Sequence, residues 1–300
     1  MKTRTLLRLS GSGLRTFLSR GKRPLVASII LTERCNLACR HCAVHDTNGV
    51  LYPYMSVRAD MQTLLDKGVR ILFFYGGEPW LWHDAGKTLS DLVREAKSMG
   101  FLLVNVVTNG TIDLDLPEAD LILVSVDGTR EHHNLIRGSS YDRVLANLRN
   151  APARNICLYM AINKLNQVDL EAVSRLARDL PKVKAVSFNF HTPYPGTEEL
   201  ALSAAEKRDC CDRLTLLLED GCPILNLRSV FPYLVANNWP RPCRQCIIME
   251  NGRSWTCGRC IDIPGLCETC GFFFAAEYSL LFSGRPRIVW DFARSYLRWL

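Results

Sequence analysis

The sequence contains no run of eighteen apolar residues, no low-complexity tract and no internal repeat. Its richest apolar segment, residues 271–282, is interrupted by Glu277. A membrane-spanning helix needs about twenty apolar residues, so none is expected. The amino-terminal residues lack the continuous apolar segment of a secretory signal. These absences exclude a membrane-spanning or secreted protein, and we expect a cytoplasmic location.

Acidic residues are missing from the first 32 positions, where seven lysines and arginines precede Glu33. The formal net charge of the 300 residues is +7, so these seven cations account for the whole excess and residues 24–300 are neutral overall. Nucleic-acid binding usually needs an excess of basic residues, which residues 24–300 lack, so we expect no nucleic-acid partner. The length suits one large domain with an appendage, or two domains.

Six short apolar segments rich in β-branched and aromatic residues predict buried strands. They span residues 25–31, 69–75, 101–107, 120–125, 156–162 and 184–190. Helical periodicity is found between them, over residues 57–68, 85–100, 141–150 and 169–180. This alternation predicts an α/β fold with a parallel sheet: a barrel, part of a barrel or a doubly wound sheet.

Polar or glycine-rich residues follow the carboxyl end of every predicted strand. In chain order they are three cysteines, GGEP (76–79), TNG (108–110), SVDG (125–128), Asn163 and HTPYPGT (191–197). Parallel α/β folds bind ligands at that edge of the sheet, so we expect these six segments to form one site.

The three cysteines after the first strand are Cys35, Cys39 and Cys42, and the next one, Cys157, is more than a hundred residues away. In a reducing compartment, clustered cysteines indicate a metal site rather than disulfides. A 4Fe–4S cluster is normally held by four thiolates, so three leave one iron with an open coordination position. That position can bind a substrate or cofactor.

The CxxxCxxC spacing resembles the radical S-adenosylmethionine (radical SAM) superfamily, and the resemblance extends over residues 25 to about 235. It implies a partial (β/α)6 barrel, similar to a TIM barrel, that holds a 4Fe–4S cluster and S-adenosylmethionine. In that family the open iron is chelated by the amino and carboxylate groups of S-adenosylmethionine, and an electron from the cluster releases a 5′-deoxyadenosyl radical. A reductant such as ferredoxin or flavodoxin is implied as a partner.

The same resemblance assigns the cofactor contacts. The glycine carbonyls are expected to accept hydrogen bonds from the cofactor's ammonium, and the polar side chains to bond ribose or carboxylate oxygens. Several of those polar side chains could instead cap loops. His41 stands where the family often has a larger aromatic residue, and it could stack on adenine. The assigned residues are His41, Gly76, Gly77, Glu78, Pro79, Asn109, Ser125, Asp127 and Asn163.

Three CxxC pairs lie near the carboxyl terminus: Cys243 with Cys246, Cys257 with Cys260, and Cys267 with Cys270. Six thiols are too many for one tetrahedral ion. The spacing of Cys246, Gly252 and Cys257, with Asn-Gly marking a hairpin, resembles the SPASM or twitch domains that hold an auxiliary 4Fe–4S cluster. The first two pairs also match a zinc ribbon. We favour the auxiliary cluster, while the choice of four ligands among the six thiols stays open.

Other cysteines and histidines carry weaker signals. Cys157, Cys210, Cys211 and Cys222 lie outside the clusters and are expected to be small buried hydrophobes. Cys222, as a hydrogen-atom donor, and His191 are candidate catalytic residues that could face the substrate, although core or loop roles suit both. Three further histidines, His83, His132 and His133, are expected at the surface.

We predict four regions: a basic amphipathic leader (1–23), a radical SAM core (24–235), a cysteine-rich auxiliary domain (236–275) and an amphipathic helix (276–300). The leader combines its seven cations with Leu6, Leu7, Leu14, Phe17 and Leu18. The last helix places Val289, Phe292, Ala293, Tyr296 and Leu300 on one stripe, opposite Arg294 and Arg298, with Trp290 and Trp299 on its flanks. Such segments suit a membrane surface. Packing on the barrel is the alternative, and the leader also fits an organelle transit peptide.

The expected function is that of a radical SAM enzyme acting on an unactivated C–H or C=C bond. The amphipathic ends and an architecture resembling adenosylhopane synthase favour a lipid or isoprenoid substrate at a membrane surface. The SPASM-like tail favours maturation of a ribosomal peptide. A protein of another class, an iron–sulfur scaffold or electron carrier without turnover, is the remaining alternative.

Overall fold

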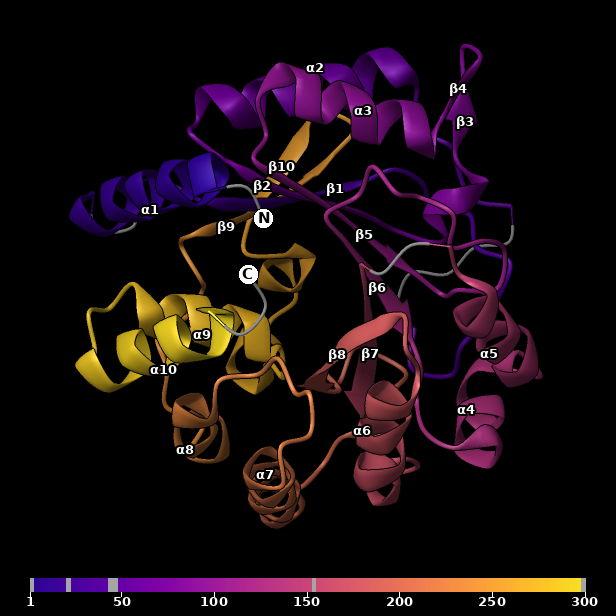
Figure 1. The fold of residues 1–300 in the computed structure, drawn as a ribbon, viewed down its shortest axis with the longest axis vertical. Helices are drawn as coiled ribbons and strands as arrows, with labels where there is room; N and C mark the ends of the chain where they lie inside the picture. The colour runs from indigo at the N-terminus through magenta and orange to yellow at the C-terminus, as the bar shows by residue number, and fades with distance from the viewer. Residues whose placement is uncertain (1–2, 20–22, 43–47, 153–154, 298–300) are drawn as a thin grey trace.

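The computed structural model describes residues 3–19, 23–42, 48–152 and 155–297. Of the positions named above, Lys2, Arg20, Lys22, Arg298, Trp299 and Leu300 lie outside these ranges. One curved sheet forms the centre of the fold, with its strands in the order β10-β9-β1-β2-β5-β6-β7-β8 (Figure 1). All neighbouring strands are parallel except β9 and β10. The expectation of a partial, TIM-like barrel is confirmed.

The six predicted strands are all present. They are β1 (Val26–Ile30), β2 (Ile71–Tyr75), β5 (Leu103–Thr108), β6 (Leu121–Ser125), β7 (Ile156–Ile162) and β8 (Val183–Phe190). Their side chains are buried on both faces, which is why each strand is a nearly continuous apolar run. Ile30 and Tyr75, the last residues of β1 and β2, are paired, and the parallel pairing of the six strands places the segments after them at one edge of the sheet.

Helices surround the sheet in Figure 1, and four of them match the predicted patterns. These are α2 (Tyr54–Asp66), α3 (Leu89–Met99), α5 (Tyr141–Asn150) and α6 (Leu170–Asp179). The pattern over residues 85–100 is helical only from Leu89, because a short β3 (His83–Asp84) and β4 (Lys87–Thr88) hairpin occupies its start. The α3 helix begins with a capping box between Thr88 and Asp91 and ends at left-handed Gly100.

Helix α4 (Arg130–Arg137) was not predicted, and it carries two buried polar residues into the structure. His133 is fully buried, so its expected surface position is wrong. Its Nδ1 accepts a hydrogen bond from the backbone N–H of Asp127, and its Nε2 lies 3.0 Å from Ser140 Oγ. His83 is exposed and His132 is partly exposed, as expected.

The carboxyl-terminal third begins with α7 (Ala204–Glu219) and α8 (Phe231–Val235), and continues into the hairpin of β9 (Cys246–Glu250) and β10 (Arg253–Thr256). The hairpin turn is the predicted Asn251-Gly252, with positive φ at both residues. Strand β9 pairs in parallel with β1 and so extends the barrel sheet rather than starting a separate one. The domain division at residue 235 stays a prediction.

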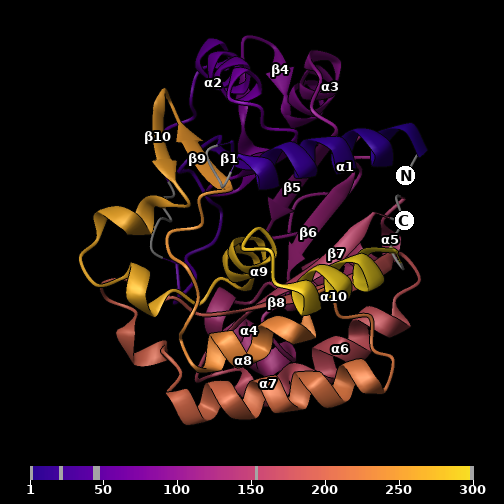
Figure 2. The ribbon, with the colours of Figure 1, turned by 90° about the vertical axis from the view of Figure 1, so that its left-hand side faces the viewer.

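Helix α9 (Phe273–Leu281) lies at the side of the sheet that is left open between β8 and β9 (Figure 2). Phe273 stacks edge-to-face on Phe190 of β8, and Phe274 contacts Phe73 of β2. Two more helices, α1 (Thr3–Leu18) and α10 (Pro286–Leu297), lie on the outer side near α9. No helix in the described ranges has the length and hydropathy needed to cross a bilayer.

Candidate cluster and cofactor site

The loop after β2 lies directly against the loop that leads into Cys35. A Cβ atom on Gly76 would lie 2.3 Å from the Thr32 carbonyl oxygen, and one on Gly77 would lie 2.1 Å from that of Arg34. The Gly77 N–H donates to the Thr32 carbonyl oxygen at 2.8 Å. Only glycine leaves room for this contact, so GGEP holds the backbone of the cysteine loop in place.

Glu78 is fully buried and links this loop to the next strand. Its carboxylate accepts hydrogen bonds from Thr108 Oγ1 at 2.7 Å, the Asn109 N–H at 2.7 Å and the Trp80 N–H at 3.2 Å. Burial raises the pKa of Glu78 to about 7, although the hydrogen bonds oppose the rise. In the structure the Glu78 side chain anchors the turns after β2 and β5. The next residue, Pro79, is buried at the start of a short 3-10 helix.

Asn109 connects the loop after β5 to the cysteines. Its Nδ2 donates to Asn36 Oδ1 at 2.8 Å and lies 3.8 Å from Cys35 Sγ. Its Oδ1 accepts from the N–H and Oγ1 of Thr111 at 2.9 and 2.7 Å. The side chain therefore positions the thiol of Cys35.

Arg137, at the end of α4, plays the corresponding part for the second cysteine. Its Nη1 lies 3.8 Å from Cys39 Sγ, and its Nε donates to Asp127 Oδ2 at 2.5 Å. The other oxygen of Asp127 accepts from the Ala161 N–H at 2.9 Å. Burial alone would raise the pKa of Asp127, but Arg137 beside it holds that pKa below its usual range. A buried cation thus faces the cysteine loop.

No motif pointed to Arg137, because it lies almost a hundred residues from Cys39 in a helix that was not predicted. Its position ten residues after Asp127 is the one available hint. Only the folded chain shows that the two side chains meet.

His41 and His191 lie side by side at this edge. Their rings meet edge-to-face with centroids 6.3 Å apart, and His41 Nε2 is 3.7 Å from Asp127 Oδ2. Burial lowers the pKa of His41 to about 4, so the ring is neutral at pH 7 and this contact is no ion pair. The Nδ1 atom of His41 is buried without a hydrogen-bond partner among the described residues. His191 Nε2 lies 3.0 Å from Thr197 Oγ1.

Ser125 and Asn163 lie at the ends of β6 and β7, at the expected edge. Asn163 accepts from the Leu165 N–H at 2.9 Å and donates to the Ala161 carbonyl oxygen at 3.1 Å, so it caps its own loop.

Cys222 does not lie at this edge. Its neighbour Ile224 bridges in parallel to Val186 within β8, which puts Cys222 towards the amino end of β8, on the side away from Cys35.

The first three cysteines fit an iron–sulfur cluster by their chemistry. Cys35 and Cys39 are buried and Cys42 is partly exposed, and each has its thiol within electrostatic range of the others. Burial raises the pKa of Cys39 to about 11, so the free thiol stays protonated at pH 7, whereas iron binding would release that proton. The orphaned His41 Nδ1 is a further polar atom that a bound group could satisfy. In the described ranges no three His, Cys, Asp or Glu side chains are arranged around a single metal ion.

The six carboxyl-terminal thiols lie in two trios, one of Cys243, Cys246 and Cys257 and one of Cys260, Cys267 and Cys270. Cys243 Sγ lies 3.2 Å from Cys246 Sγ, and the Cys257 N–H donates to the Cys246 carbonyl oxygen at 2.8 Å. Burial, with smaller contributions from the nearby thiols of Cys260 and Cys267, raises the pKa of Cys270 to about 12. Cys257 is within electrostatic range of both Cys260 and Cys270, so it lies between the trios.

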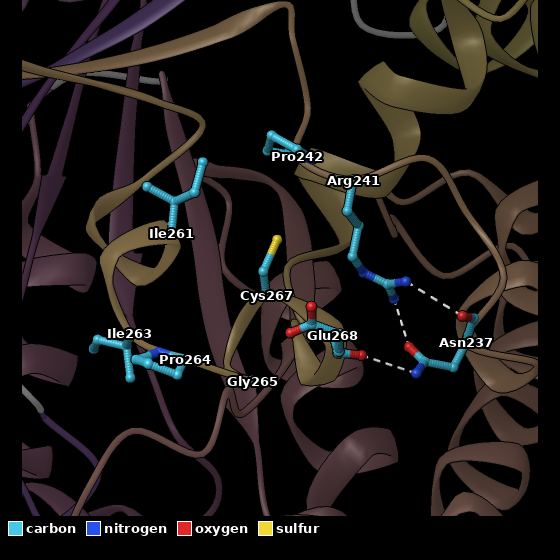
Figure 3. Close-up of a pocket in the computed structure, with 9 residues that line it drawn as sticks. All are labelled: Asn237, Arg241, Pro242, Ile261, Ile263, Pro264, Gly265, Cys267 and Glu268. Atoms are coloured by element: carbon cyan, nitrogen blue, oxygen red, sulfur yellow. Dashed lines mark hydrogen bonds between the residues drawn. The ribbon is translucent and has the colours of Figure 1, made fainter.

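Arg259 joins the cysteine-rich segment to the first cysteine loop. Its guanidinium forms ion pairs with Glu250 and, at 3.6 Å, with Glu33, two residues before Cys35. On the outer side, Cys267 faces a hollow beside Arg241 (Figure 3). The guanidinium of Arg241 lies 4.0 Å from the Trp239 ring and donates to Asn237.

This geometry defines an α/β partial-barrel protein with three thiols grouped at the carboxyl edge of its strands. The sequence model of the Radical SAM superfamily matches residues 29–180, and the chain belongs to that superfamily. The expectation from the CxxxCxxC resemblance is therefore confirmed.

Three similar proteins illustrate the relationship. Fe-coproporphyrin III synthase of Methanosarcina barkeri is 32% identical over 229 residues, which are 68% of this chain and 55% of that protein. PqqA peptide cyclase of Xanthomonas euvesicatoria is 37% identical over 90 residues, or 29% of this chain and 23% of that one. The crystal structure of Streptococcus suis SuiB bound to precursor peptide SuiA has a TM-score of 0.62 at 13% identity, covering 93% of this chain and 69% of that one. The chain spans about half the length of the first of these relatives, and less of the second.

Proposed function

We propose that this protein holds a 4Fe–4S cluster through Cys35, Cys39 and Cys42, binds S-adenosylmethionine at that cluster and cleaves it reductively. The observation that carries the proposal is the buried network at the carboxyl edge. Asn109 positions the thiol of Cys35, and Arg137 faces that of Cys39. When bound, the cluster and S-adenosylmethionine supply an electron transfer that yields a 5′-deoxyadenosyl radical for attack on a carbon centre.

The protein's own residues prepare this site. Glu78 ties the turns after β2 and β5 together, and Asp127 holds the Arg137 guanidinium against the cysteine loop. Arg137 provides a buried positive charge that favours thiolate at Cys39 and an anionic ligand next to it. Cys35, Cys39, Glu78 and Asp127 are buried, which limits the access of water to this part of the site.

The carboxyl-terminal thiols are proposed to bind an auxiliary 4Fe–4S cluster. The close pair Cys243 and Cys246, together with Cys257, supports a shared site, and the third cysteine pair lies within reach. Arg259 connects this region to the loop of the first cluster, which suits electron transfer from a ferredoxin or flavodoxin through either region.

For the substrate, we propose a peptide. The support is the match to PqqA peptide cyclase and the fold shared with SuiB, which was crystallised with its precursor peptide. A tetrapyrrole is the second candidate, because the match to Fe-coproporphyrin III synthase extends over 68% of this chain. The lipid or isoprenoid substrate that the chain ends suggested gains no support from these relatives.

The first test is formation of 5′-deoxyadenosine after anaerobic reconstitution and reduction with dithionite. We expect the product from the wild type and none from Cys42→Ala, which should also bind less iron. Cys157→Ala removes a buried thiol outside the clusters and should retain both. A wild-type protein with its full iron content but no 5′-deoxyadenosine would establish the scaffold or electron-carrier alternative instead.

The second test compares substrates. Peptides encoded next to this gene and iron coproporphyrin are added separately, and stimulation of 5′-deoxyadenosine formation is measured together with a mass change in the added compound. Modification of the peptide alone supports the peptide proposal. Modification of the porphyrin alone would replace it.

A further inference from the structure

Helix α1 turns its most apolar stripe away from the protein. Leu7, Leu14 and Leu18 are 68%, 58% and 70% exposed. With 3.6 residues per turn, these three positions fall within about 40° of one another around the helix. They therefore form one continuous outer stripe.

The opposite side of α1 attaches it to the fold. Thr16 is buried and Leu9 contacts the core, and both lie roughly opposite the leucine stripe. Phe17 extends to the turn between α9 and α10, where its ring lies 3.2 Å from the position of a Cβ on Gly284. A surface helix normally buries its apolar stripe, so this orientation is the reverse of the usual one.

Helix α10 adds to the same side of the molecule, as both Figure 1 and Figure 2 show. Val289 is 43% exposed and Trp290 is 71% exposed. The described ranges expose thirteen large apolar side chains, and six of them lie on α1 and α10. The others are spread over many elements, as on most protein surfaces, whereas this group is concentrated.

The charge beside the stripe indicates what covers it. Arg8 and Arg15 are exposed on one flank of the stripe, and no acidic residue precedes Glu33. If a second copy of the chain bound this face by a twofold contact, the arginines of the two copies would lie close together and repel each other. An anionic bilayer instead attracts the cations and accepts leucine and tryptophan at its interface.

We propose that α1 and the exposed residues of α10 dock this protein on an anionic lipid bilayer. The leucine stripe and Trp290 enter the interfacial region, and Arg8 and Arg15 contact lipid phosphates. The carboxyl edge of the strands, which bears the first three cysteines, is not part of this surface. Docking is therefore independent of the substrate that the protein uses.

The test uses the full chain, reconstituted anaerobically, and sedimentation with vesicles. Mixed phosphatidylcholine and phosphatidylserine vesicles are compared with phosphatidylcholine alone. We expect binding to the mixed vesicles that weakens as salt is added. The triple variant Leu7→Ser, Leu14→Ser and Leu18→Ser should weaken binding at least about tenfold. The double variant Arg8→Gln and Arg15→Gln should weaken it by about fivefold for each arginine at low salt.

A matched control replaces three exposed apolar residues elsewhere, Met55, Val168 and Leu216, by serine and should bind as the wild type does. Iron content and melting temperature verify that every variant folds. Absence of binding, equal binding of the wild type to neutral and mixed vesicles, or binding of the arginine variant to mixed vesicles as tight as that of the wild type would overturn the proposal. A concentration-dependent dimer that the leucine variant dissolves, without vesicle binding, would assign the surface to a second copy.

Discussion

Replacing Asp127 by asparagine removes the negative charge of a buried ion pair while keeping nearly the same shape. The Asp127 carboxylate is fully buried and accepts from Arg137 Nε at 2.5 Å, and Arg137 is only 9% exposed. Asparagine can still accept the Ala161 N–H at the remaining oxygen position. The perturbation therefore leaves the arginine without its counterion and sets the NH2 group of the new asparagine, a donor, against the donor Nε–H of Arg137.

The expected cost follows from the burial of both partners. Breaking a buried ion pair by neutralising one side costs about 3 to 5 kcal/mol, because the other charge remains desolvated. Arg137 keeps its contact with the thiol of Cys39, so we expect the lower end, about 3 kcal/mol. For a chain of this size that corresponds to a melting temperature lower by roughly 5 to 10 °C.

The assay is thermal unfolding of the anaerobically reconstituted variants, with iron content measured on the same samples. Asp142→Asn is the matched control, since it removes the partner of Arg130 in an ion pair whose side chains are 61% and 63% exposed. Exposed pairs contribute at most about 1 kcal/mol, so its melting temperature should stay near that of the wild type.

A double variant makes the test specific to the pair. Asp127→Asn combined with Arg137→Gln should cost less than the sum of the two single variants, because the stranded charge is gone. If Asp127→Asn melts with the wild type, or if the double variant is strictly additive, the buried ion pair does not stabilise this edge as described.

Two further predictions concern packing and pH. Gly77→Ala should disrupt the cysteine loop and reduce bound iron, since its Cβ would lie 2.1 Å from the Arg34 carbonyl oxygen, whereas Gly11→Ala, with nothing nearby, should be tolerated; equal iron in both would contradict the proposed contact. Burial raises the pKa of Glu277 to about 7, so the wild type should lose stability as pH rises from about 4.5 to 7. Glu277→Gln keeps the oxygen that accepts the Leu227 N–H and should be more stable above pH 7 by about 2 kcal/mol. Urea unfolding at pH 5.5 and 8 measures this, and a difference between the two proteins that does not change with pH would refute it.

One expectation from the sequence is wrong and one candidate role lacks support, each for an identifiable reason. His133 was expected at the surface, yet tertiary contacts bury it together with Arg137. Cys222 is buried as expected, but the chain after α7 returns along β8 and places this cysteine away from the site. The positions of both residues depend on where the chain turns back in three dimensions, and the local periodicity of the sequence does not predict those turns.

The sequence by itself determined the barrel strands and the order of the segments at their carboxyl ends. Buried parallel strands require long apolar runs, and the chemistry of three clustered thiols is visible in their spacing alone. Only the tertiary structure decided which polar groups meet, as when Arg137 reaches Cys39 across almost a hundred residues. It also decided the orientation of α1, because an amphipathic pattern defines two faces but not which of them the rest of the protein contacts.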